Sequence, residues 1–196
     1  MPGKSSNLRA VLVAVPLFLG GYFALTAFAD WGLSGTKWLA SSLLGGSEVA
    51  TADVFDVPDS SNDVQAVAAV ENLQNAIRPA IAILMGVGLV LSLLWWLSWR
   101  AKADDVTGPE AAGALKFLWL MLLLVLIVVA AGVGVYLHEA TPLGSDMTGE
   151  GKTWLGLILG GTTLLLFWLA TAWPTPNALR PSAPGSGWFP LHTKRG

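Results

Sequence analysis

Residues 117–137 read FLWLMLLLVLIVVAAGVGVYL and contain no charged side chain. A helix rises about 1.5 Å per residue, so a stretch of this length can cross the roughly 30 Å hydrocarbon core of a bilayer. Leu, Val and Ile follow one another without the alternation of a barrel strand, and in lipid a helix satisfies its own backbone hydrogen bonds. The stretch therefore predicts a transmembrane helix.

Three further segments have the same character. Residues 10–29, 79–99 and 154–173 are each about one span long and contain no Asp, Glu, Lys, Arg or His. The whole chain is 54% hydrophobic and only 12% charged, with a mean hydropathy of +0.60, which is far from the composition of a water-soluble domain. We predict an all-α integral membrane protein with four transmembrane helices.

The charges outside these spans indicate the orientation. Eight of the eleven Lys and Arg residues lie in residues 1–9, 100–116 and 174–196. Most Asp and Glu residues lie instead in the other two segments, residues 30–78 and 138–153. Because basic residues mark cytoplasmic segments, both termini and the middle loop are predicted on the cytoplasmic side, an N-in/C-in topology.

The outer segment of residues 30–78 is expected to hold two helical pieces. Residues 36–44 are followed by two glycines and carry Trp38, which favours a short helix in the membrane interface. From Ser61, apolar residues recur at helical spacing, so an amphipathic helix is expected to continue into the second span, with a kink allowed at Pro79.

The cytoplasmic tail of residues 174–196 contains five prolines, so we expect it to be extended or disordered. Pro181 and Pro184 fit a loose polyproline-recognition pattern. The Trp188-Phe189 pair before two basic residues favours instead a contact with the anionic inner leaflet.

The first span also resembles a secretory signal. Two basic residues precede it, and it ends in Ala27-Phe28-Ala29, a cleavage-like tripeptide of small residues at the first and third positions. Its apolar run of about 20 residues is longer than the 7 to 15 usual for a signal. We therefore expect it to be retained as an anchor, with cleavage after Ala29 as the alternative.

Tryptophan is expected at the headgroup level of a bilayer, where its ring meets apolar and polar surroundings at once. Most of the ten tryptophans fall near the predicted ends of the spans. The predicted anchors are Trp31, Trp38 and Trp154 at the outer boundary and Trp95, Trp96, Trp99, Trp119 and Trp173 at the inner boundary.

The glycines concentrate in the predicted outer halves of the spans. Small residues let helix backbones approach in lipid, and Gly156 and Gly160 have the small-xxx-small spacing. We expect a bundle that is tight on its outer side, with the third and fourth spans as the closest pair. The predicted packing positions are Gly132, Gly134, Gly156, Gly160 and Gly161.

No pattern for catalysis or cofactor binding occurs. The absence of cysteine excludes thiolate metal sites and thiol catalysis, and a net charge of -2 argues against a nucleic-acid partner. The spans lack the titratable groups that relay charge through a bilayer, and their polar side chains are hydroxyls. We therefore expect no enzyme, no cofactor and no metal.

These observations favour a non-catalytic multi-pass subunit that acts in the assembly or scaffolding of a larger complex of the bacterial inner membrane, of the secretion, conjugation or respiratory type. Its expected partners are the lipid bilayer and other membrane proteins, or a second copy of itself. The alternative is a small oligomeric channel or carrier for uncharged solutes, with the hydroxyls along the path. A third possibility is an enzyme that acts on lipids near His138 and Glu139.

Overall fold

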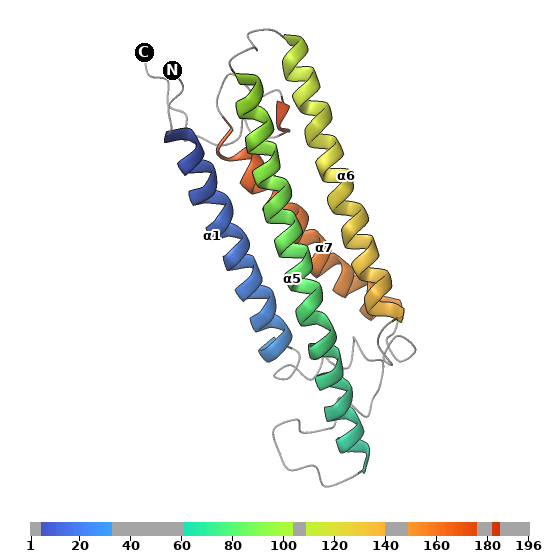
Figure 1. Ribbon diagram of the computed structural model, residues 1–196. Coiled ribbons are helices and arrows are strands. Elements are labelled where there is room, and N and C mark those ends of the chain that lie inside the picture. The colour runs from blue at the N-terminus through green and yellow to red at the C-terminus, as the bar shows by residue number, and fades with distance from the viewer. Residues whose placement is uncertain (1–4, 33–60, 104–108, 140–148, 176–181, 185–196) are drawn as a thin grey trace. The chain divides into compact units, whose positions relative to one another are not determined.

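The computed structural model describes residues 5–32, 61–103, 109–139, 149–175 and 182–184. Within these ranges the regular elements are helices: α1 (Ser5–Ala27), which continues as the short π-helix η1 (Phe28–Gly32), α5 (Ser61–Ala103), α6 (Pro109–Glu139) and α7 (Gly149–Ala172), shown in Figure 1.

Each of the four long helices contains a stretch that is long and apolar enough to cross a membrane. These stretches are Val11–Trp31, Glu71–Ser98, Gly113–Leu137 and Thr153–Ala172. The predicted all-helical fold with four candidate spans is confirmed, while the N-in/C-in topology stays a prediction. The interfacial helix expected at residues 36–44 lies outside the described residues.

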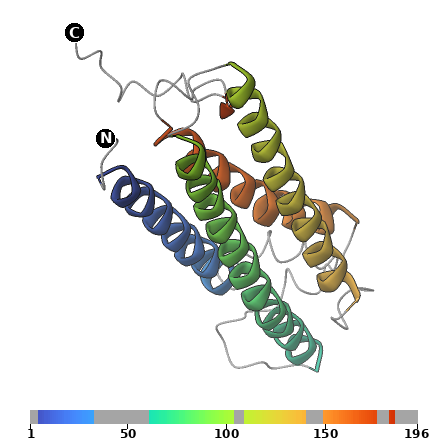
Figure 2. The same cartoon turned by 45° about the horizontal axis from the view of Figure 1, so that its top comes forward.

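The amphipathic stretch from Ser61 forms the first turns of α5 itself. This helix continues through Pro79 without interruption in both views of the molecule (Figure 1, Figure 2). A proline inside a helix has no N–H to donate, so only the bond to the carbonyl of Asn75, four residues earlier, is lost. The loop helix and the second span are therefore one element.

The chain forms two units. Unit 1 comprises Met1–Gly20, Met85–Val128 and Thr163–Gly196, and unit 2 comprises Gly21–Leu84 and Val129–Thr162. Each unit contains one portion of each long helix, and helices that follow one another in the chain run in opposite directions.

The core of unit 1 is built from large side chains. Phe18, Trp95 and Phe167 are almost completely buried, and the Trp119 and Phe167 rings lie 5.7 Å apart between centroids. Gly88 of α5 admits the Phe18 ring, because a Cβ at this glycine would lie 2.5 Å from Phe18 Cε1. The absence of a side chain at Gly88 is what lets α1 and α5 meet here.

Part of the proline-rich tail also belongs to this core. Ser182 and Ala183 are buried, and the indole N–H of Trp168 donates to the backbone oxygen of Pro184 at 2.7 Å. The second proline of the polyproline-like pattern is thus joined to α7. The tail beyond Pro184 lies outside the described residues.

The four spans differ in how much protein covers them. Half of the apolar stretch of α5 is buried, compared with 17% of that of α6, which has the highest mean hydropathy at 2.9. Large apolar side chains such as Leu124, Val128 and Val135 of α6 are exposed. In a membrane such a helix presents most of its circumference to lipid or to another protein.

Candidate functional site

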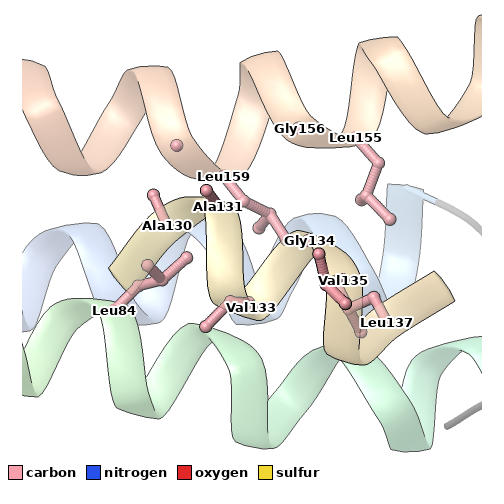
Figure 3. Close-up of a pocket in the computed structure, with 11 residues that line it drawn as sticks. Leu84, Ala130, Ala131, Val133, Gly134, Val135, Leu137, Leu155, Gly156 and Leu159 are labelled. Carbon is pink, nitrogen blue, oxygen red and sulfur yellow. The ribbon is translucent and has the colours of Figure 1, made fainter. Parts of the chain in front are cut away.

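A cavity of about 350 Å³ lies in unit 2, between α6 and α7 (Figure 3). Leu84 of α5 closes one side of it. The remaining lining comes from the end of α6 and the start of α7: Ala130, Ala131, Val133, Gly134, Val135 and Leu137, and Leu155, Gly156, Leu159 and Gly160.

The cavity exists because small residues of α6 and α7 face each other. Ala130 and Gly134 are four residues apart on α6, and Gly156 and Gly160 have the same spacing on α7. The Cβ of Ala130 lies 3.9 Å from where a Cβ on Gly160 would stand, which is an ordinary contact. At Gly134 and Gly156 an added Cβ would meet no atom within 4 Å. The helices α6 and α7 are therefore close at Ala130 and Gly160, and they leave space beside Gly134 and Gly156.

The walls of the cavity are chemically uniform. No lining residue has a polar side chain, and the bordering backbone groups lie within α5, α6 and α7. A cavity holds ordered water only where polar groups can bond it, so this one favours apolar occupants. At about 30 Å³ per water-sized group, it has room for on the order of ten methylene-sized groups.

The cavity is open to the surface of the unit. Val135 is 54% exposed, and Gly156 is also exposed, whereas Leu155, Leu159 and Val133 are buried. An occupant would therefore enter past Val135 and Gly156 and rest against the leucines. The geometry suits a hydrocarbon chain or the apolar side chains of another helix.

The predicted packing positions divide into two groups. Gly134, Gly156 and Gly160 line the cavity, whereas Gly132 and Gly161 are exposed and do not line it. An added Cβ at Gly132 or Gly161 would meet no atom within 4 Å, so these two glycines stand beside open space. Close approach of the third and fourth spans at Gly132 and Gly161 stays a prediction. Sequence reasoning did not single out Leu84 as part of this site.

The tryptophans predicted as anchors differ in their exposure. Trp31 and Trp154 are 77% and 52% exposed, as an interfacial anchor requires, and Trp173 is half-buried. Trp95, Trp96 and Trp119 are instead buried in unit 1. Trp38 lies outside the described residues, and of Trp99 only the backbone is described.

Two of the buried indoles, Trp96 and Trp119, donate their N–H groups to partners within the protein. Trp119 Nε1 donates to Thr171 Oγ1 at 3.0 Å, and Trp96 Nε1 donates to the backbone oxygen of Ala170 at 3.3 Å. The polar end of each ring finds its partner on α7, which allows the whole ring to lie in the core. These rings have little exposed surface, and their predicted contact with headgroups stays a prediction.

Unit 2 also contains an ion pair where α1 ends. Arg78 of α5 donates from Nε and Nη2 to Asp30 Oδ1 at 3.1 and 2.9 Å. One turn earlier on α5, Gln74 Nε2 donates to the backbone oxygen of Asp30 at 3.1 Å. Both acceptors belong to the residue that directly follows the first apolar run.

No protein-family model, curated protein or solved structure matches the chain. The four apolar helices define the class, an integral membrane protein. Within the described residues, no three side chains of His, Cys, Asp or Glu come together as a metal-binding group.

Proposed function

We propose that the chain is a non-catalytic subunit of a larger inner-membrane assembly, and that the cavity between α6 and α7 receives apolar side chains of a partner membrane protein. The observation that carries the proposal is the cavity itself, which has small residues on two facing helices and an opening to the surface of unit 2.

The reason lies in how helices associate in lipid. Hydrocarbon tails are as apolar as leucine, so two helices gain little by hiding apolar area and depend on close packing of their surfaces. Exposed glycines such as Gly132, Gly156 and Gly161 allow a second backbone to approach. The cavity beside them offers a recess into which the side chains of that helix fit.

The position of α6 supports the same proposal. It is the least covered and most apolar of the four spans, yet its C-terminal end carries alanine and glycine in place of the leucines that fill its middle. Ala130 already lies in contact distance of α7, whereas Gly132 and Gly134 leave open space beside α6. A helix that faces a partner gains a shorter distance between backbones.

Site-specific photo-cross-linking in native membranes tests the proposal. A photoreactive residue at Val135, at the mouth of the cavity, should give a discrete adduct with another protein. The matched control is Leu157 of α7, which is 59% exposed, lies in the same unit and does not line the cavity. It should give no discrete protein adduct.

The product cross-linked at Val135 distinguishes a complex subunit from an oligomeric channel or carrier. An adduct from Val135 to a different membrane protein supports the subunit, whereas an adduct to a second copy of this chain favours the oligomeric channel or carrier. Lipid adducts alone at Val135, with the same pattern as at Leu157, would contradict the proposal.

A further inference from the structure

The tripeptide that resembles a signal cleavage site is helical in this structure. Ala27 is the last residue of α1, and Phe28 and Ala29 begin the π-helix η1. Ala29, which would lie directly before the cut, has no exposed surface. The Thr26 hydroxyl donates to the backbone oxygen of Tyr22, which ties the preceding turn together.

The residue that would follow the cut is held from two sides. Arg78 holds the Asp30 carboxylate through two N–H groups, and Gln74 holds the Asp30 carbonyl. Gln74 and Arg78 are one turn apart on α5, 44 and 48 positions from Asp30 in the chain. Asp30, Gln74 and Arg78 are called the Asp30 clamp below.

A protease must reshape this segment before it can act. Chains are cut most readily where the backbone is exposed and already free of structure. Hydrolysis of the bond between Ala29 and Asp30 would therefore require both helical turns to open, Ala29 to leave the core and Asp30 to lose its partners on α5. Local opening of this kind is rarer where more contacts must break together.

We propose that the Asp30 clamp protects the bond between Ala29 and Asp30 from signal peptidase-type endoproteases, which recognise small residues at the first and third positions before the cut. The clamp keeps the cleavage-like tripeptide helical and keeps α1 joined to the rest of the protein. This inference is independent of the proposed function, because it concerns α1 and α5 and not the cavity.

Digestion of the purified full chain in mild detergent tests the clamp. The wild-type protein and a Gln74→Ala/Arg78→Ala variant are incubated with purified bacterial signal peptidase, and intact mass is followed with time. The wild type should keep its mass, while the variant should release the first span and leave a chain that begins at Asp30. The cleaved fraction should rise at least several-fold.

Two controls make the result specific. Ala27→Leu added to the double variant removes the small residue at the third position before the cut and should restore the full mass. Gly88→Ala disturbs unit 1, whereas the clamp residues belong to unit 2, so this variant reports the effect of general destabilisation and should stay uncut.

Four results would overturn the proposal: a wild-type protein that is cut after Ala29, a double variant that stays intact, a double variant still shortened after Ala27→Leu, or equal cleavage of Gly88→Ala. A wild-type chain from native membranes that begins at Asp30 would overturn it as well.

Discussion

Gly88 is the residue at which a single methyl group should matter most. An alanine Cβ there would lie 2.5 Å from Phe18 Cε1, and the ring is 2% exposed and enclosed by the core, so it cannot easily swing away. Overpacking of this kind costs about 1 to 3 kcal/mol. We expect Gly88→Ala to lower the melting temperature of the detergent-solubilised protein.

Gly86, two residues earlier on the same helix, is the natural control. It is exposed, and an added Cβ would meet nothing within 4 Å. Gly86→Ala should be neutral or slightly stabilising, because alanine favours a helix by up to about 1 kcal/mol over glycine. Equal losses for the two variants would show that the Phe18 contact is not the cause.

The bond between Trp119 and Thr171 gives a second prediction at this scale. Thr171→Val keeps the shape of the side chain but removes the acceptor of a buried indole N–H. An unsatisfied buried donor costs about 1 to 3 kcal/mol, so the melting temperature should fall. Thr171→Ser keeps the hydroxyl and should lose less. If valine and serine behave alike, the hydrogen bond contributes nothing measurable.

At the scale of elements, the cavity between α6 and α7 can be filled without a clash. Gly156 lines it, and a Cβ there meets no atom within 4 Å, so leucine at this position can extend into the space. We expect Gly156→Leu to leave the melting temperature unchanged or raise it while reducing recovery of the partner cross-linked from Val135. Loss of stability without loss of the cross-link would contradict the assignment of the cavity to a partner.

The helices could be predicted from the sequence, but not all of their details. Each span was recognisable from its apolar length, and the sequence also led us to expect the helix from Ser61 to continue into the second span, as α5 does. At Pro79 the sequence allowed a kink within this helix. In the helix it removes only one hydrogen bond, which the continuous backbone on either side tolerates.

The candidate site shows a similar limit of sequence reasoning. The spacing of Gly156 and Gly160 marks a small-residue face on α7, and Ala130 and Gly134 mark another on α6. Whether two such faces close on each other depends on the direction of each helix and on residues such as Leu84 of a third helix. Periodicity along one helix contains no information about that distance.

The burial of the tryptophans could not be predicted either, because it depends on residues of other helices. Depth along a span can be counted in residues, and it groups Trp95, Trp96 and Trp119 near one boundary. The side of the helix on which each ring lies is set by partners such as Thr171 and Ala170, which are more than 50 residues distant in the chain.

At the scale of the whole molecule, the topology gives the last prediction. The chain has no cysteine, so single cysteines can be introduced without background. An impermeant thiol reagent applied to intact cells should label cysteines at Ser47 and Gly149 and should not label cysteines at Thr107 and Ser186, because basic flanks stay in the cytoplasm. Labelling at Thr107 in intact cells would reverse the orientation.

The unbroken course of α5 has a mechanical consequence. From Ser61 to Arg78 the helix is about 26 Å long at 1.5 Å per residue, and it precedes the apolar residues that begin at Pro79. A rod of hydrogen-bonded turns transmits tension and torque far better than a flexible linker of equal length. A force applied at Ser61 would therefore be carried along α5 to Arg78, which is joined to Asp30 by the ion pair.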